Sequence, residues 1–238
     1  MDGVPRWAEL DPGDGTDPDA VTRFYAAVLG WASGDGVTAG HQQRVLRHED
    51  AAVAALGSSG AAAPPAWTLY LAVDDVDAAA EHLAELGGEV LHGPEDDLAG
   101  GRLLVALDAG GAVVGLWGSD DPVATPGPGR LCWAEAASAE PGTTRTFYRE
   151  LLGWRFADGA DVGHLVASAG DRPVAGVGLA GDALPHWLPY FGVADVDAAA
   201  GAAREAGGGV VVAVTAGPRG RRAVLSDPAG AHVGVVEV

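Results

Sequence analysis

The chain has 238 residues, of which 48% are hydrophobic, so it is long enough for one large domain or two ordinary ones and can bury a real core. Its formal net charge is −19, and all 14 basic residues are arginine. A surface of this sign repels phosphate backbones and anionic lipid, which argues against nucleic acid or a membrane as a partner. The charge fits either attraction of a cationic ligand or a solubilising surface alone.

Cysteine content and the N-terminal segment indicate the compartment. The single cysteine, Cys132, excludes an intramolecular disulfide bond. No apolar run reaches the ~18 residues that a membrane-spanning helix needs. The N-terminal segment MDGVPRWAELDPGDG is acidic and lacks the basic and apolar regions of a secretory signal. We therefore expect a cytoplasmic protein.

The predicted elements begin with a short strand at Trp7–Leu10, followed by a helix. Asp17 or Asp19 can cap this helix, and Pro18 fits its first turn. Gly30 ends the helix in the manner of C-terminal glycines. Apolar residues in between recur at the i, i+3, i+4 spacing of a buried helical face. This face consists of Val21, Phe24, Tyr25, Val28 and Leu29.

Two strand-like runs follow, at residues 42–48 and 51–57, joined by a turn at Glu49–Asp50. The order then starts again, with a strand at 67–73 and a helix at 75–88 that ends in a pair of glycines. Three further strands come next, in the sequences GEVLHG, RLLVALD and GAVVGLW. The first half of the chain therefore contains two βαβββ units, and the second half repeats them.

The repetition shows that the chain is a tandem duplication. RFYAAVLGW, which ends at residue 31, returns as TFYRELLGW, which ends at residue 154, an offset of 154 − 31 = 123. Three further segment pairs keep the same order at nearly the same offset: RWAEL with CWAEA, DDVDAAAEHLAELGGEVL with ADVDAAAGAAREAGGGVV, and DAGGAVVGLW with DPAGAHVGVV. The sequence predicts two modules, at residues 1–121 and 130–238, joined by a Pro- and Gly-rich linker at residues 122–129.

These repeated segments resemble the vicinal oxygen chelate superfamily, which includes glyoxalase I, extradiol dioxygenases, fosfomycin resistance enzymes and bleomycin-resistance proteins. The resemblance covers nearly the whole chain, twice, and is nearest to the two-module, glyoxalase-like actinobacterial proteins whose first strand carries Trp-x-Glu-Leu. It implies an α+β fold in which four βαβββ units form two half-barrel glyoxalase-like modules around cavities. The superfamily supports several chemistries as well as binding alone, so the fold does not determine the function.

The resemblance also implies where a metal would be held. Catalytic members use His, Gln or Glu side chains, and a metal needs about three or four such ligands converging on one cavity. Here the implied ligand positions are occupied by Trp7, Trp133, Thr68, Leu188, Gly115 and Gly234. Neither an indole nor a glycine offers a side-chain lone pair. We therefore expect no metal and no cofactor.

The histidines do not form the spaced pairs of a metal site, H-x-H or H-E-x-x-H. We expect surface or loop positions for His41, His48, His82, His92, His164 and His186. His232 is different, because it lies two residues before Gly234 and thus on the strand face expected to line the cavity. We keep His232 as a candidate acid or base.

Strand alternation predicts which side chains line the cavities, because Trp7 and Glu9 share one strand face, as do Trp133 and Glu135. The predicted ligand-binding set is Trp7, Glu9, Thr68, Tyr70, Trp117, Trp133, Glu135, Tyr190 and His232. Aromatic faces of this kind bind planar or cationic ligands. The alternative is that Trp7 and Trp133 only fill the barrels, with Glu9 and Glu135 paired to arginine.

Three functions remain open. The first is a metal-free protein of the drug-sequestration or resistance type, which binds an aromatic or cationic small molecule. The second is a metal-independent lyase, isomerase or cyclase of a biosynthetic pathway, with Glu9, Glu135 or His232 as acid or base. The third is a divalent-metal glyoxalase-type enzyme with unusual ligands. In each case the expected partner is a small molecule, and the chain is a monomer or a homodimer.

Overall fold

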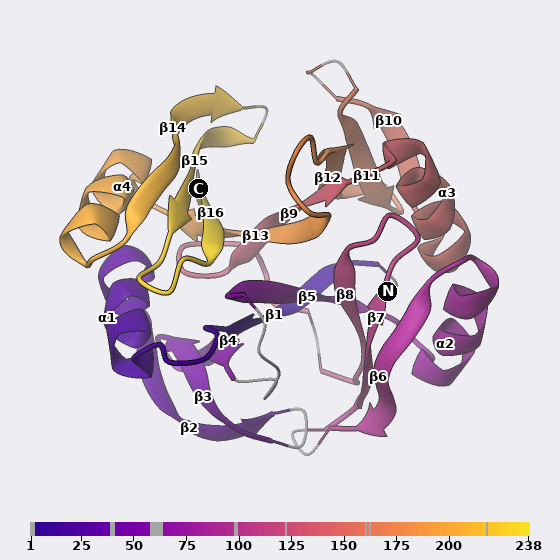
Figure 1. Cartoon of the computed structure of the whole chain (residues 1–238), viewed down its shortest axis with the longest axis horizontal. Helices are drawn as coiled ribbons and strands as arrows, with labels where there is room; N and C mark the ends of the chain where they lie inside the picture. Colours follow the sequence, from indigo (N-terminus) through magenta and orange to yellow (C-terminus); the bar gives the residue numbers. More distant parts are fainter. Residues whose placement is uncertain are drawn as a thin grey trace. The chain divides into compact units, whose positions relative to one another are not determined.

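The computed structural model describes residues 3–38, 41–57, 64–97, 100–121, 123–159, 161, 163–217 and 219–238, and gives only the backbone at 35–38 and 41–43. Its strands and helices follow the predicted strand–helix–strand order (Figure 1). In chain order they are β1 (Pro5–Asp11), α1 (Pro18–Leu29), β2 (Ala32–Thr38), β3 (His41–His48), β4 (Ala51–Leu56), β5 (Ala66–Ala72), α2 (Val76–Glu85), β6 (Glu89–Asp96), β7 (Arg102–Leu107), β8 (Val113–Gly118), β9 (Leu131–Ser138), α3 (Pro141–Leu152), β10 (Arg155–Asp158), β11 (Leu165–Ala169), β12 (Arg172–Leu179), β13 (His186–Val193), α4 (Val196–Glu205), β14 (Gly209–Gly217), β15 (Gly220–Ser226) and β16 (His232–Glu237).

The strands form two eight-stranded mixed sheets, ordered β2-β3-β4-β1-β5-β8-β7-β6 and β10-β11-β12-β9-β13-β16-β15-β14. In each βαβββ unit the first strand pairs in parallel with the last, as β1 does with β4 and β9 with β12. The remaining strands of the unit pair antiparallel, as β2 does with β3 and β3 with β4. The predicted α+β fold of four βαβββ units is thereby confirmed.

One strand, β2, lacks a sequence pattern that predicts it. Its sequence, ASGDGVT, contains two glycines and no alternation of apolar and polar residues. The strand forms at the edge of its sheet because its backbone pairs residue by residue with β3, from Ala32 opposite Arg47 to Thr38 opposite His41. Pairing with a neighbouring strand thus overrides a weak local preference here.

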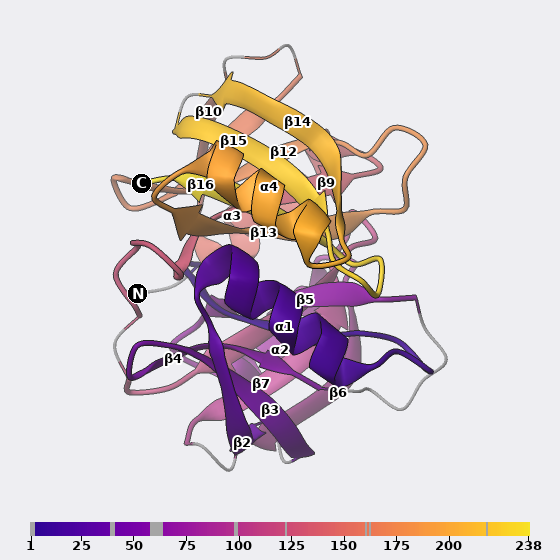
Figure 2. The ribbon, with the colours of Figure 1, turned by 90° about the vertical axis from the view of Figure 1, so that its left-hand side faces the viewer.

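Packing groups the chain into two compact units that do not coincide with the two sequence copies. Unit 1 comprises Met1–Arg6, Thr68–Val123 and Trp133–Leu188, and unit 2 comprises Trp7–Trp67, Ala124–Cys132 and Pro189–Val238. Each unit therefore combines most of the first βαβββ segment of one copy with most of the second segment of the other. Within unit 2, for example, α1 and α4 lie side by side (Figures 1 and 2). The module boundaries read from the sequence stay a prediction.

Helix α1 begins and ends where the sequence indicates. Asp17 caps its N-terminus by accepting a hydrogen bond from the backbone N–H of Asp19, and Pro18 is its first residue. Gly30 follows the last turn with a φ of 69°, the left-handed conformation that favours glycine. The buried face consists of the five predicted residues, Val21, Phe24, Tyr25, Val28 and Leu29.

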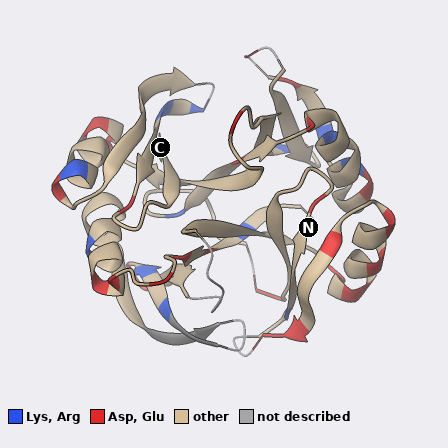
Figure 3. Cartoon of the chain, viewed as in Figure 1, with Lys and Arg blue, Asp and Glu red and all other residues tan. Residues whose placement is uncertain are grey.

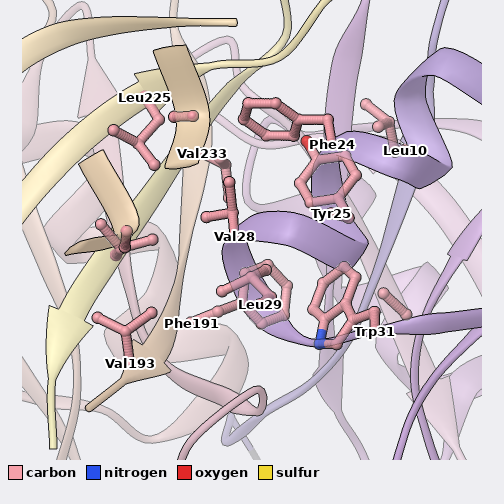
Figure 4. Close-up of a cluster of buried hydrophobic side chains, with 14 of the residues drawn as sticks. Leu10, Phe24, Tyr25, Val28, Leu29, Trp31, Phe191, Val193, Leu225 and Val233 are labelled. Carbon is pink, nitrogen blue, oxygen red and sulfur yellow. The ribbon is translucent and has the colours of Figure 1, made fainter. Parts of the chain in front are cut away.

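The buried face of α1 packs against strands of the second copy in unit 2. Figure 4 shows its side chains opposite Phe191 on β13 and Val233 on β16. The Trp31 ring meets Phe191 edge to face, with ring centroids 4.8 Å apart. A Cβ atom at Gly208 would lie 2.4 Å from the ring of Phe24. Gly208 is therefore needed for this close approach.

A buried tyrosine–aspartate hydrogen bond joins the two copies within each unit. Tyr25 Oη donates to Asp227 Oδ2 at 3.0 Å in unit 2, and Tyr148 Oη donates to Asp108 Oδ2 at 2.8 Å in unit 1. The other oxygen of each aspartate accepts two backbone N–H groups of its own turn. Trp187 Nε1 also donates to Tyr148 Oη, at 3.1 Å. The repeated FY motif of each copy thus meets the Asp-x-x-Gly turn of the other.

Burial of these groups shifts their pKa values. Burial raises the pKa of Tyr25 and of Tyr148 well above 10, and the neighbouring carboxylate charge raises each further. Burial also raises the pKa of Asp108 and of Asp227 above 3.8, although the hydrogen bonds that each accepts oppose this shift. Both tyrosines are therefore held as neutral donors at physiological pH.

Charged side chains lie mainly on the helices and near the ends of strands (Figure 3). The same exposed ion pair recurs in both copies, between Arg102 and Asp77 at 2.7 Å and between Arg221 and Asp197 at 2.6 Å. Among the residues that the structure describes, none of the helices combines the length and the hydropathy needed to cross a bilayer.

We predict that Tyr148→Phe lowers the free energy of unfolding by about 1–3 kcal/mol, because Asp108 and Trp187 each lose a buried hydrogen-bond partner. Tyr25→Phe should cost less, since Trp67 Nε1, the counterpart of Trp187, forms no hydrogen bond of ordinary geometry among the described residues. Urea unfolding followed by circular dichroism measures both values. Equal costs for the two variants would contradict the contribution of Trp187.

We predict that the two buried phenols stay protonated when unfolded tyrosine ionises. Unfolded tyrosine loses its proton near pH ~10, whereas Tyr25 and Tyr148 keep theirs in the folded chain. The free energy of unfolding is therefore unaffected below about pH 10 and falls as the pH rises above that value. Ultraviolet titration of the folded protein should miss at least two of the 4 tyrosines until urea is added. Ionisation of all of them in a folded chain would refute this.

Candidate functional site

Trp133 and Glu135 lie two residues apart on β9, on the same side of the strand. Trp133 Nε1 donates to Glu135 Oε1 at 2.6 Å, and Trp133 itself is buried. The first copy has the same pair on β1, where Trp7 Nε1 donates to Glu9 Oε1 at 3.3 Å. Strand alternation brings each indole beside a carboxylate. In both copies the tryptophan thus fixes one oxygen of the glutamate.

A histidine completes this arrangement in the second copy. His164 Nε2 lies 2.8 Å from Glu135 Oε2, so both oxygens of the carboxylate are engaged. The side chains of His164 and Glu135 remain 22% and 17% exposed. Because a carboxylate only accepts hydrogen bonds, Nε2 carries the proton in this contact. We refer to Trp133, Glu135 and His164 as the His164 site.

A glycine on β12 makes room for the His164 site. Gly176 lies directly opposite Glu135 in the parallel pairing of β9 with β12. A Cβ atom at Gly176 would lie 2.1 Å from Glu135 Oε2 and 2.6 Å from His164 Nε2. Any larger residue at this position would therefore separate the histidine from the carboxylate. In the first copy the residue opposite Glu9 is Ala55, so the two copies differ at this point.

His164 lies in the loop that precedes β11, as expected from the sequence. Its side chain is partly buried and pairs with Glu135, a contact that the sequence does not predict. One hydrogen-bond partner of Glu135 is thus a histidine. The duplication carries a signal for this residue, because His164 follows Trp154 by 164 − 154 = 10 residues and His41 follows Trp31 by 41 − 31 = 10. The side chain of His41 lies outside the described residues.

The other predicted site residues are distributed over both units. Thr68 is half-buried on β5, and Tyr190 is buried on β13. In unit 1, Tyr70 and Trp117 meet edge to face at 6.3 Å, and the Arg6 guanidinium lies 5.2 Å from the Trp117 ring centroid. A cation of the protein already occupies the Trp117 face that a cationic ligand would use.

His232 and the buried tryptophans offer a ligand different amounts of surface. His232 is exposed at the start of β16, where it pairs with Ser226 of β15. Trp7 and Trp133 are both buried, so each presents little of its indole face. The Glu135 side chain is 17% exposed and lies beside His164, which was not among the predicted ligand-binding residues.

The implied metal positions do not fit a metal ion. Tyr70 pairs with Gly115 across β5 and β8, and Tyr190 pairs with Gly234 across β13 and β16. A Cβ atom at Gly115 would lie 2.2 Å from the Tyr70 ring, and one at Gly234 would lie 2.3 Å from the Tyr190 ring. A tyrosine ring thus fills the space where the superfamily's glutamate ligand would begin. Over the described ranges, no three His, Cys, Asp or Glu side chains are grouped to hold a metal.

We predict that Gly234→Ala lowers the free energy of unfolding by about 1–3 kcal/mol, because the added methyl group must displace the Tyr190 ring. Gly201→Ala is the matched control, since a Cβ atom at this helical position meets nothing within 4 Å. This control should raise stability by ~0.5–1 kcal/mol. Thermal unfolding compares the two variants. A Gly234→Ala protein as stable as the unmodified chain would refute the close contact with Tyr190.

Known proteins resemble this chain over its whole length. A family model of the glyoxalase-like domain matches it twice, at residues 11–116 and 133–236. The anthracycline biosynthesis protein DnrV of Streptomyces peucetius is 35% identical over 263 residues, covering 99% of this chain and 94% of DnrV. CFP32 of Mycobacterium tuberculosis (strain CDC 1551 / Oshkosh), named provisionally as a glyoxylase, is 34% identical over 252 residues, covering 99% and 95%.

Solved structures share the fold at low sequence identity. The Mn(II)-bound glyoxalase from Novosphingobium aromaticivorans has a TM-score of 0.71 at 16% identity, over 100% of this chain and 83% of its own. The 2,3-dioxygenase LapB from Pseudomonas sp. KL28 has a TM-score of 0.72 at 14% identity, over 100% and 93%. The family match in both copies and the similarity to full-length relatives show that the chain belongs to the glyoxalase-like domain family of the vicinal oxygen chelate superfamily.

Proposed function

We propose that this protein binds a hydroxylated polycyclic aromatic molecule without the help of a metal ion. The observation that carries the proposal is the tyrosine ring over glycine, in both copies, where the superfamily places a metal-ligating glutamate. A glutamate at Gly115 or Gly234 would need the space that Tyr70 or Tyr190 occupies. Recognition of the ligand then depends on protein side chains alone.

The relatives support this class of ligand. DnrV is named for anthracycline biosynthesis. Anthracyclines as a chemical class are fused hydroxyquinones that carry a cationic amino sugar. A net charge of −19 attracts such a cation and repels nucleic acid and anionic membranes. We therefore propose binding of the sequestration or resistance type, with a small molecule as the partner and the protein acting as a monomer or a homodimer in the cytoplasm.

A second candidate is a metal-independent lyase, isomerase or cyclase that acts on the same class of compound. The contact between Glu135 and His164 favours it, because a carboxylate that orients an imidazole is a common arrangement for proton transfer. A divalent-metal glyoxalase-type activity has less support, since the residues at the implied ligand positions lack the necessary donors.

Equilibrium dialysis against the anthracycline doxorubicin tests the proposed function. We expect saturable binding that prior dialysis against EDTA leaves unchanged, and no stoichiometric manganese, nickel or zinc in the protein by mass spectrometry. The urea-unfolded protein serves as the control for nonspecific adsorption. Loss of binding in EDTA with recovery on adding a metal would overturn the metal-free proposal, and no binding at all would overturn the ligand class.

A further inference from the structure

We propose that a cavity between the turn joining β3 to β4 and the segment 125–130 binds a free α-amino acid with an apolar side chain. The cavity lies within unit 2 and has a volume of about 350 Å³. Its walls include His48, Glu49, Thr125, Pro126, Pro128 and Arg130. Ligand pockets commonly measure ~300–1,000 Å³, so this one suits a small molecule. The inference does not depend on the proposed binding of an aromatic compound.

Two opposite charges border this cavity without pairing with each other. Arg130 is half-buried and Glu49 is exposed, and within the described part of the chain neither side chain forms an ion pair or a hydrogen bond. Glu49 would repel a ligand that is only an anion, and Arg130 would repel one that is only a cation. A free amino acid carries both charges, so its carboxylate can pair with the guanidinium and its ammonium group with the Glu49 carboxylate. The two unpaired side chains therefore select a zwitterion.

The backbone of Glu49 has a conformation that favours glycine. Glu49 has a φ of 55° and is the first residue of the two-residue turn that follows His48. In the corresponding turn between β11 and β12 this place is taken by Gly170, with a φ of 59°. The fold thus accepts a glycine here, whereas the first copy has a glutamate at a cost in backbone energy. A strained residue beside a cavity favours a role in function.

His48 adds a second unfavourable feature to the same cavity. Its Nδ1 atom is buried and has no hydrogen-bond partner among the residues that the structure describes. The ring packs closely against the backbone of Gly129, where a Cβ atom would lie 2.3 Å from His48 Cδ2. In the second copy Ala169 stands before Gly170 as His48 stands before Glu49. Both side chains that distinguish the first turn from the second therefore line the cavity.

Hydrogen bonds fix the opposite wall of the cavity. Gly129 N–H donates to Gly192 O at 2.8 Å, and Gly192 N–H donates to Arg130 O at 2.9 Å. Trp31 Nε1 donates to Gly129 O at 2.7 Å. The two prolines of this wall have fixed φ angles and offer apolar rings to the side chain of the ligand. Since this segment is already ordered, less conformational entropy is lost when the ligand binds.

Isothermal titration calorimetry of the whole chain with L-leucine tests the proposal. We expect saturable binding of L-leucine and none of N-acetyl-L-leucine or L-leucinamide, because the first derivative lacks the ammonium group and the second lacks the carboxylate. In nitrogen–proton correlation spectra, L-leucine should shift the indole N–H signal of Trp31. The signal of Trp154, which donates to Gly3 O at 3.1 Å in the other unit, should not move.

Substitutions separate the two charges from the rest of the surface. Arg130→Gln and Glu49→Gln should each weaken L-leucine binding about 10- to 100-fold, the worth of a hydrogen bond to a charged group. The matched controls are Arg145→Gln, at an exposed position on α3, and Asp50→Asn, at the next residue of the turn. Both controls should keep the affinity of the unmodified chain.

A glycine at position 49 distinguishes a role in binding from a role in stability. Glu49→Gly should weaken binding as Glu49→Gln does, but without lowering the free energy of unfolding, because glycine adopts a positive φ readily. Circular dichroism shows whether each variant is folded. Absence of L-leucine binding, equal binding of either derivative, or an unchanged affinity in Arg130→Gln or Glu49→Gln would overturn the proposal.

Discussion

Two buried hydrogen bonds between tyrosine and aspartate are the constraint on which each compact unit depends. Each bond ties a helix of one copy to the last turn of the other, Tyr25 to Asp227 and Tyr148 to Asp108. Since the carboxylate also receives two backbone N–H groups, helix and turn fix each other's position. A tryptophan stacks on each tyrosine, with ring centroids 5.3 and 4.9 Å apart. The most conspicuous repeats in the sequence therefore serve assembly.

The same assembly carries a different residue opposite the glutamate in each copy. Trp-x-Glu recurs on β1 and β9, and the indole binds the carboxylate both times. The two copies differ by a single methyl group at this place, because Ala55 pairs with Glu9 whereas Gly176 pairs with Glu135. The core residues that join the copies in unit 2 lie on both helices and strands, including the neighbours of Ala55 on β4.

The sequence predicts the parts of this protein that obey local rules. The cap, the buried face and the end of α1 follow from residues within one helix, and the four βαβββ units follow from their repetition. β2 escapes prediction because its partner strand, not its own composition, determines its structure. The contact between His164 and Glu135 could not be predicted, because the two residues lie 29 positions apart in the sequence, one in a loop and the other on β9. The packing of segments from both copies within each compact unit could not be predicted. A constant offset between repeats does not indicate which copy contacts which.

Covalent linkage of the copies has a genetic consequence at Gly176 and Ala55. In a symmetric dimer of one module, these two positions would be encoded by a single codon and would always change together. A fused chain keeps the two copies at high effective concentration for each other and gives each position its own codon. One position can then change while its counterpart in the other copy stays as it is. A difference such as alanine at one position and glycine at the other can therefore be inherited from a duplicated gene, but not from a gene that encodes a single module.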